Sequence, residues 1–225
     1  MKPGDDIASR IDHTLLKADA TEDEIRDLCR EAREYGFAAV CVNPVWVSLC
    51  RQLLQDTDVM VATVIGFPLG AISAEAKAEE AARAVAGGAD ELDMVMNLGF
   101  LKSGRDAEVE EDIRGVVQPA GGKTVKVIIE TTLLTDEEKV KACRLARQAG
   151  AHFVKTSTGF SKGGATVHDV VLMRREVGES MGIKASGGIR TAEQTHTLLA
   201  AGATRIGTSA SVTIITGDDN YKQSC

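Results

Sequence analysis

The sequence contains no apolar run of the roughly 20 residues that a membrane-spanning helix requires. Its first ten residues, MKPGDDIASR, lack the apolar core of a signal peptide, so we expect a cytoplasmic protein without a membrane partner. A basic excess is also missing: 26 Lys and Arg stand against 33 Asp and Glu, a net charge of -7. Nucleic acid is not an expected partner, because binding a phosphate backbone needs a basic surface.

Several catalytic and cofactor motifs are missing as well. Four histidines are scattered without HExxH or a similar spacing, and the five cysteines contain no CxxC pair. We therefore predict free thiols, with no disulfide framework, no metal and no cofactor. Cys41, inside a predicted strand, is expected as a core residue. The chain also lacks the GxSxG motif of serine hydrolases.

What the sequence does contain is a regular alternation of short apolar runs and amphipathic stretches, with 44% hydrophobic residues overall. This alternation is typical of βαβ units. The predicted strands are 11–15, 38–42, 59–65, 91–96, 125–130, 153–156, 183–186 and 205–208. The predicted helices are 21–35, 44–55, 73–87, 106–117, 135–149, 167–180 and 191–201.

The ends of these helices carry recognisable capping residues. Thr21 with Glu24 and Thr135 with Glu138 have the spacing of a capping box. Glycines typical of left-handed helix ends follow four of the helices: Gly36, Gly88, Gly150 and Gly202. Eight strands with covering helices predict an α/β fold, a (β/α)8 TIM barrel, as one domain over 1–225 with 217–225 as a flexible tail. An open doubly wound sheet is the alternative, but no GxGxxG motif follows the first strand.

Charged residues lie inside strands that a parallel sheet would bury on both faces. Lys155 ends the strand in HFVKT, and Lys184 lies in the next strand. Lys155 is either an ammonium reaching solvent at the barrel mouth or a neutral amine that attacks a carbonyl. A second cation on the neighbouring strand would lower the pKa of Lys155 and favour the amine. Asp93, in ELDMVM, either neutralises a lysine or transfers protons.

Three further charges receive weaker assignments. Asp12, on the first strand, is expected to have a structural or hydrogen-bonding role. Lys126 lies near the start of its strand, the end of such barrels that serves stability, and is expected in a buried ion pair. Glu130 ends the same strand at the catalytic end, and we assign it no role.

Two glycine-containing turns predict a phosphate site. Ser186–Arg190 follows the seventh predicted strand, and Gly207–Ser209 follows the eighth. Barrels often bind phosphate with the loops after these two strands, because glycines allow the backbone amides to approach an anion closely. Ordinary turn chemistry is the alternative.

The chain resembles the deoxyribose-phosphate aldolase family along nearly its whole length. The motifs that carry the resemblance, in the family's order and spacing, are IDHTLLK, AVCVNP, ATVIGFPLG, ELDMVMN, KVIIETTLLT, FVKTSTGF, KASGGIRT and RIGTS. The resemblance implies a lyase, a class I aldolase on a TIM barrel that needs no metal. It implies reversible cleavage of 2-deoxy-D-ribose 5-phosphate to acetaldehyde and D-glyceraldehyde 3-phosphate in deoxyribose phosphate catabolism.

The resemblance also implies residue roles. Lys155 matches the lysine that forms the Schiff base, Lys184 the lysine that lowers its pKa, and Asp93 the aspartate of the proton relay. The residues that match the family's phosphate contacts are Gly159, Gly187, Gly188, Gly207 and Ser209. The expected partner is a small phosphorylated sugar, and the family's usual assembly is a homodimer or homotetramer.

Two positions depart from the family's pattern. Ser209 is followed by Ala210 instead of a second serine, with Ser211 one place later, so one phosphate hydrogen bond is lost or moved. Tyr221 lies near the end of the chain but is not the last residue, which puts in doubt the tyrosine that aids proton transfer in some members. The rival functions are another Schiff-base barrel aldolase and a non-catalytic barrel that binds phosphosugars.

Overall fold

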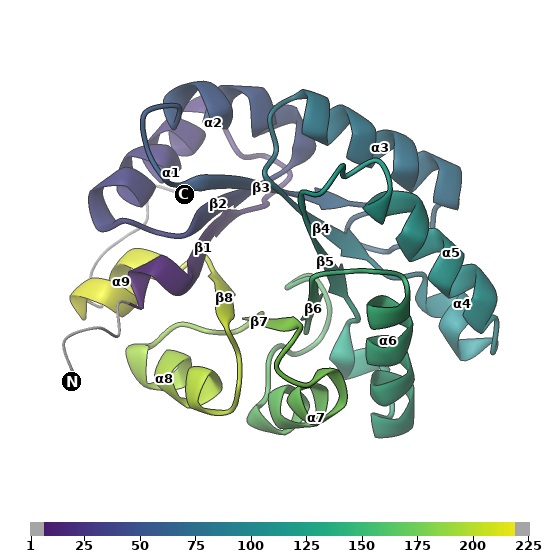
Figure 1. Cartoon of the computed structure of the whole chain (residues 1–225). Coiled ribbons are helices and arrows are strands. Elements are labelled where there is room, and N and C mark those ends of the chain that lie inside the picture. The colour runs from purple at the N-terminus through teal and green to yellow at the C-terminus, as the bar shows by residue number, and fades with distance from the viewer. Residues whose placement is uncertain (1–6, 219–225) are drawn as a thin grey trace.

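A computed structural model describes residues 7–218 of the chain. Eight parallel strands close into a barrel in the order β1 to β8, and the larger helices surround it (Figure 1). The strands are β1 Ile11–Leu15, β2 Ala39–Val42, β3 Met60–Ile65, β4 Glu91–Val95, β5 Thr124–Ile128, β6 Phe153–Lys155, β7 Gly182–Ser186 and β8 Arg205–Thr208. The predicted (β/α)8 barrel is confirmed, and the open sheet is excluded by the closure.

The helices alternate with the strands along the chain. The α-helices are α1 Glu22–Tyr35, α2 Val47–Leu53, α3 Ala74–Ala86, α4 Leu98–Lys102, α5 Asp106–Val117, α6 Asp136–Gln148, α7 Val167–Val177, α8 Ala192–Ala200 and α9 Ser211–Thr216. Three 3-10 helices are η1 Ala8–Arg10, η2 Pro44–Trp46 and η3 Thr131–Leu133. The predicted helices did not include α4, and the predicted helix 44–55 combined η2 and α2.

The predicted helix caps form as expected. The hydroxyl oxygens of Thr21 and Thr135 accept from the amides of Glu24 and Glu138. The carboxylates of these glutamates accept from the threonine amides, so both capping boxes are complete. These boxes satisfy amide groups that the first turn of a helix leaves without partners. Gly36 ends α1 at φ 66°, a left-handed conformation that a residue without Cβ adopts at little cost.

The barrel closes where the first strand meets the last. Asp12 of β1 is in register with Gly207 of β8, so the first and the last strand of the barrel are neighbours. Lys155 of β6 is in register with Lys184 of β7. Because all strands are parallel, their C-terminal ends meet at one face of the barrel, and every loop that leaves this face starts from a strand end.

The apolar residues form a large cluster and a small one. The large cluster includes alternate residues of β2 and β3, such as Val40 and Val61, together with residues of the covering helices. The small cluster takes the intervening strand positions and is made of Leu16, Ala39, Cys41, Ala62 and Val64. Since successive strand residues face opposite sides, the small cluster fills the barrel beside β2 and β3. Cys41 is fully buried there, as expected of a core residue.

Within residues 7–218, no helix is long and apolar enough to cross a membrane. The four cysteines in this part of the chain are buried free thiols. Most of the predicted tail, including Tyr221, lies outside the described residues; α9 ends at Thr216, and Gly217 follows it at φ 71°.

Candidate active site

Lys155 stands at the C-terminal end of β6, at the bottom of a cavity of about 410 Å³. The lysine is 2% exposed, and its Nζ donates to Oδ2 of Asp93 at 2.8 Å. A lysine so deeply buried is not an ammonium snorkelling to solvent, which was the first of the two interpretations open from the sequence. The structure brings its nitrogen to a carboxylate inside the barrel instead.

Lys184 completes a cluster with Lys155 and Asp93. Its Nζ donates to the same Oδ2 of Asp93 at 2.6 Å and lies 2.5 Å from Oδ2 of Asp12. Lys184 and Asp93 are fully buried, and Lys155 is the member of the group that lines the cavity. The three residues that the resemblance assigned to catalysis therefore form one hydrogen-bonded group.

A second set of charges lies beneath this group. Lys126 Nζ is 2.7 Å from Oδ1 of Asp93 and 2.6 Å from Oε2 of Glu91. Arg205 joins Glu91 to Asp12, at 3.0 Å and 2.6 Å from the two carboxylates. The predicted buried ion pair of Lys126 is confirmed, and Asp12 has the structural role expected of it. The sequence reading missed Glu91 and Arg205, whose position at the start of a strand gave no sign of burial.

The charges in the barrel nearly balance. Three carboxylates (Asp12, Glu91 and Asp93) are held by four basic side chains (Lys126, Lys155, Lys184 and Arg205). One base must lose its proton if the interior is to be neutral. Because uncompensated charge is costly at low dielectric, the least stabilised cation among the four is the one that becomes a neutral amine.

Among the three lysines of the group, Lys155 is the one whose pKa is lowered. Burial lowers the pKa of Lys155, and the charge of Lys184 lowers it further, although Asp93 opposes both. Burial also acts against charge on Lys184, but Asp12 and Asp93 together raise its pKa well above the usual value. Lys126 behaves in the same way, since its pKa is raised against burial by Asp93 and Asp12. A neutral Lys155 is the protonation state that a nucleophilic amine requires.

Asp93 is the most strongly stabilised anion of the set. Burial alone would raise its pKa, but Lys126, Lys155 and Lys184 hold the pKa well below its usual range. Asp93 accepts hydrogen bonds from all three lysines, as expected of an ionised carboxylate. Asp12 is similar: its three basic neighbours outweigh burial and lower its pKa to about 2.

The cavity above Lys155 is lined by all five residues that match the family's phosphate contacts. These residues are Gly159, Gly187, Gly188, Gly207 and Ser209. Gly187 and Gly188 have φ values of 89° and 75°, which favour glycine and turn the backbone at the mouth. The loops after β6, β7 and β8 thus meet at one wall, as a phosphate site would need.

The serine that follows Ala210 does not replace the missing second serine. The hydroxyl of Ser211 is fully buried, is hydrogen-bonded to His13 at 2.9 Å and donates to the carbonyl of Thr208. Ser211 is not among the residues that line the cavity. The hydrogen bond that was expected to be lost or moved is therefore not supplied by Ser211.

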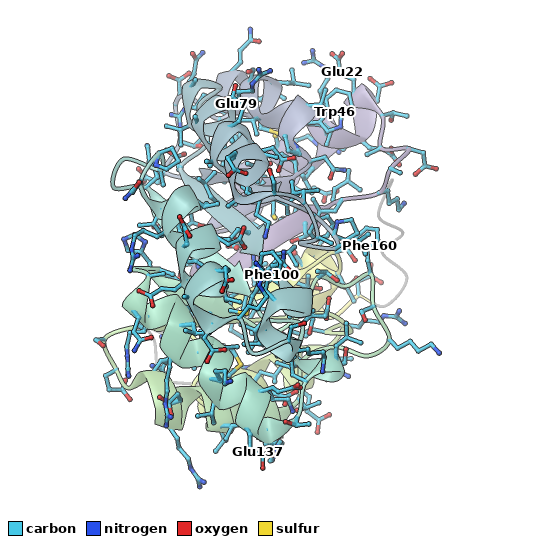
Figure 2. All side chains as sticks on the ribbon, turned by 90° about the vertical axis from the view of Figure 1, so that its right-hand side faces the viewer. Glu22, Trp46, Glu79, Phe100, Glu137 and Phe160 are labelled. Atoms are coloured by element: carbon cyan, nitrogen blue, oxygen red, sulfur yellow. The ribbon has the colours of Figure 1, made fainter. Side chains whose placement is uncertain are left out.

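Several residues that line the cavity were not predicted as site residues from the sequence. Lys17 and Arg190 are exposed cations at the cavity, and Leu16 and Phe160 give it apolar surface. Phe160 is 58% exposed and packs edge-on against Phe67 with ring centroids 5.2 Å apart. Trp46 and Phe160, which follow β2 and β6, lie toward the same side of the view in Figure 2. Lys17 and Arg190 belong to the motifs IDHTLLK and KASGGIRT, but an exposed lysine or arginine in a loop is too common to be predicted as a site residue.

Glu130 takes no part in the charged group. Its carboxylate instead accepts hydrogen bonds from Thr158, in the loop after β6. Among the described residues, one set of possible metal ligands consists of Asp136, His168 and Asp169, outside the barrel. The ammonium of Lys139 already pairs with both aspartates of that set.

Comparison with known proteins agrees with this geometry. Residues 7–215 match the family described as DeoC/LacD family aldolase. A deoxyribose-phosphate aldolase of Geobacillus sp. (strain WCH70) is 60% identical over 219 residues, which cover 96% of this chain and 98% of that protein. A deoxyribose-phosphate aldolase of Streptococcus pneumoniae serotype 19F (strain G54) is 61% identical over 208 residues, covering 92% and 94%.

Solved structures give the same result. The deoxyribose phosphate aldolase of Aeropyrum pernix, described as a tetramer, is 39% identical and superposes with a TM-score of 0.87 over 93% of this chain and 89% of that one. A protein described as QR15, an aldolase, is 41% identical, with a TM-score of 0.90 over 93% of this chain and 94% of that one.

Proposed function

The chain belongs to the DeoC/LacD family of aldolases, and on that basis we propose that it cleaves 2-deoxy-D-ribose 5-phosphate to acetaldehyde and D-glyceraldehyde 3-phosphate. The observation that carries the proposal is the buried amine of Lys155, 2.8 Å from Asp93 at the bottom of a cavity with glycine-rich walls. The reaction is a reversible carbon–carbon lyase step in the breakdown of deoxyribose phosphate.

The reaction begins with attack of neutral Lys155 on C1 of the open-chain sugar. The Nζ–C1 bond forms, and the resulting carbinolamine loses its oxygen as water to give an iminium ion. The positive charge of the iminium develops beside the ionised carboxylate of Asp93, which stabilises it. The iminium then serves as the electron sink that a metal ion provides in other aldolases.

Cleavage follows at the bond between C2 and C3. A water molecule held by Asp93 and Lys184 removes the proton of the C3 hydroxyl, and C3 becomes the aldehyde of glyceraldehyde 3-phosphate. The electron pair of the C2–C3 bond moves to form an enamine between C2 and C1, which neutralises the nitrogen. Protonation at C2 and hydrolysis of the imine release acetaldehyde and return Lys155 to its amine form.

The phosphate of the substrate binds at the mouth of the cavity in this proposal. The amide groups around Gly187, Gly188 and Ser209 donate to its oxygens, and Lys17 and Arg190 supply positive charge against the acidic background of the chain. Binding at this remote point orients C1 toward Lys155 and contributes to catalysis without touching the reacting atoms.

Borohydride trapping tests the proposal. The protein is incubated with 2-deoxyribose 5-phosphate, reduced, digested and examined by peptide mass spectrometry. We expect a reduced adduct on Lys155 and release of acetaldehyde in the unreduced reaction. Product analysis separates other Schiff-base barrels, which release a different carbonyl compound. Binding of the sugar phosphate without any adduct would support a non-catalytic binding barrel instead.

Three further properties are proposed from the same family membership. The chain works as a single domain, in the cytoplasm, and as a homo-oligomer. A tetramer is described for the relative from Aeropyrum pernix. Light scattering coupled to gel filtration measures the assembly directly, and a monomeric mass at working concentration contradicts this part of the proposal.

A further inference from the structure

We propose that Glu130 is a positioning residue that holds one wall of the substrate cavity, the turn Thr158–Phe160, in its binding shape. The inference rests on the proposed function, because it assigns Glu130 to the binding of the phosphorylated end of that substrate. Glu130 does not line the cavity and acts only through the turn.

The backbone of Glu130 is the first observation. Its φ of 50° and ψ of 66° are left-handed, and among residues 7–218 it is the one non-glycine residue with a positive φ. This conformation is unfavourable for a residue with a side chain, and it persists only where the surroundings fix it. Glycine would remove the backbone penalty, so the presence of glutamate here indicates that its side chain is used.

The side chain of Glu130 is directed to a single partner. It is 3% exposed, and its Oε2 accepts hydrogen bonds from both the backbone amide, at 3.1 Å, and the hydroxyl of Thr158. Its other oxygen, Oε1, is buried and has no hydrogen-bond partner among the described residues. Burying a carboxylate with one oxygen unpaired costs stability. The two hydrogen bonds to Thr158 are what the protein gains from burying it.

Thr158 transmits the constraint to the cavity. Its hydroxyl donates to Glu130 and accepts from the amide of Phe160 at 3.1 Å, which closes the turn over Gly159. Gly159 itself has a φ of 85°. All three residues of the turn line the cavity that begins at Lys155. Glu130 thereby fixes the direction of the Gly159 amide and the place of the Phe160 ring.

Neighbouring contacts fix the loop on both sides of this turn. The amide of Thr131, next to Glu130, donates to the carbonyl of Thr156 at 2.9 Å. Also before the turn, the hydroxyl of Ser186 donates to the carbonyl of Ser157 at 2.6 Å. Beyond the turn, the amide of Ala165 donates to the carbonyl of Gly187 at 3.1 Å. With both flanks held, the Thr158–Phe160 turn is the part of the loop whose shape depends on Glu130.

Three variants separate the hydrogen bonds from the backbone. Glu130→Gly removes the carboxylate and leaves a residue suited to the left-handed backbone. Glu130→Gln keeps an oxygen that accepts from Thr158. Glu130→Asp keeps the charge but withdraws it from Thr158, and it provides the test if the glycine variant does not fold. Circular dichroism and thermal melting establish that each variant is folded before its kinetics are compared.

The kinetics are measured with 2-deoxyribose 5-phosphate and with unphosphorylated 2-deoxyribose. For Glu130→Gly and Glu130→Asp we expect KM for the phosphorylated sugar to rise about tenfold, as expected from losing two buried hydrogen bonds, with kcat nearly unchanged. The kcat/KM for 2-deoxyribose should change less than about twofold, and Glu130→Gln should restore most of the KM. Inorganic phosphate should inhibit the folded glycine or aspartate variant more weakly than the wild-type enzyme.

Three results would overturn the inference. Equal loss on both substrates would show that Glu130 does not act on the phosphorylated end. Loss of kcat with an unchanged KM would place Glu130 in the chemical step. Wild-type kinetics in the folded glycine or aspartate variant would show that the turn does not depend on Glu130. Failure of the proposed function is recognised separately, because the wild-type protein would then give no acetaldehyde and no reduced adduct.

Discussion

Lys155 and Lys184 face each other directly across β6 and β7, and their pKa values are shifted in opposite directions. The Nζ atoms of both lysines donate to Oδ2 of Asp93, but only Lys184 has a second carboxylate, Asp12. The additional counter-charge determines which lysine remains a cation. The two lysines therefore differ in their partners, although they share residue type, burial and register.

Replacing Lys155 should abolish turnover and leave the fold intact. Lys155→Leu removes the one basic group in excess over the three buried carboxylates, so we expect the free energy of unfolding to change by about 1 kcal/mol or less. The matched variant Lys126→Met removes the cation shared by Asp93 and Glu91, leaving Lys184 and Arg205 as their closest remaining counter-charges, and should cost about 3–5 kcal/mol. Urea unfolding and product assays measure both effects. Measurable turnover in Lys155→Leu would contradict the assignment of the nucleophile.

Replacing Lys184 should move the pH dependence of the reaction. Without its charge the pKa of Lys155 rises, so the acid limb of the kcat/KM profile should shift upward by about one pH unit or more. Lys184→Met tests this, and Lys184→Arg, which keeps the positive charge, should shift the limb less. Measuring kcat/KM from about pH 5 to about pH 9 locates the acid limb in each variant. An unchanged limb in Lys184→Met would show that Lys184 does not set the protonation of Lys155.

The barrel interior should make the protein sensitive to acid. The pKa of Asp12 falls from 3.8 to about 2 on folding, which corresponds to roughly 2–3 kcal/mol of stability. A lowered carboxyl pKa stabilises the folded state above the unfolded pKa, and this contribution disappears as the pH falls from about 4 to about 2. We expect the urea midpoint to drop steeply in this window. Asp12→Asn should be less stable at neutral pH and should lose less on acidification.

Gly207 should be required for the position of Lys184. A Cβ at Gly207 would lie 2.8 Å from Cε of Lys184 and 3.1 Å from Cβ of Ser186, closer than ordinary contacts. Gly207→Ala should therefore displace Lys184 and lower kcat by about tenfold or more. Gly36→Ala is the control: it is strained at φ 66° but meets nothing within 4 Å, and it should cost only stability, about 1 kcal/mol. Equal kcat in the two variants would contradict the steric argument.

Sequence patterns predicted the strands closely because buried parallel strands are short apolar runs between polar stretches. Both bounds of β1 and β8 agree with the prediction, and so does one bound of each of β2, β3, β4, β6 and β7; the remaining bounds differ by one or two residues. The short helices α4 and α9 were not predicted as such, since five or six residues hold too few turns for a periodic pattern.

The site was predictable where a charge stood in the middle or at the C-terminal end of a strand. Lys155, Lys184 and Asp93 were found in this way, and the structure brings them together on one oxygen atom. Glu91 and Arg205 were missed because the first residue of a strand is equally suited to solvent. Glu130 was noticed but left without a role, since its left-handed backbone and its bonds to Thr158 are visible only in three dimensions.

The pairing of β1 with β8 has a consequence for the order in which the protein forms during synthesis. Arg205 reaches Asp12 across 193 positions of sequence, and His13 reaches Ser211 across 198. Contacts so distant in the chain form slowly, because the entropy lost on closing so long a loop must be offset by the contacts that follow. A chain emerging from the ribosome carries Asp12 and Glu91 long before their arginine exists. The last strand thus closes the sheet against β1 and also brings Arg205 to Asp12 and Glu91. Closure of the barrel and neutralisation of these two buried carboxylates therefore occur together.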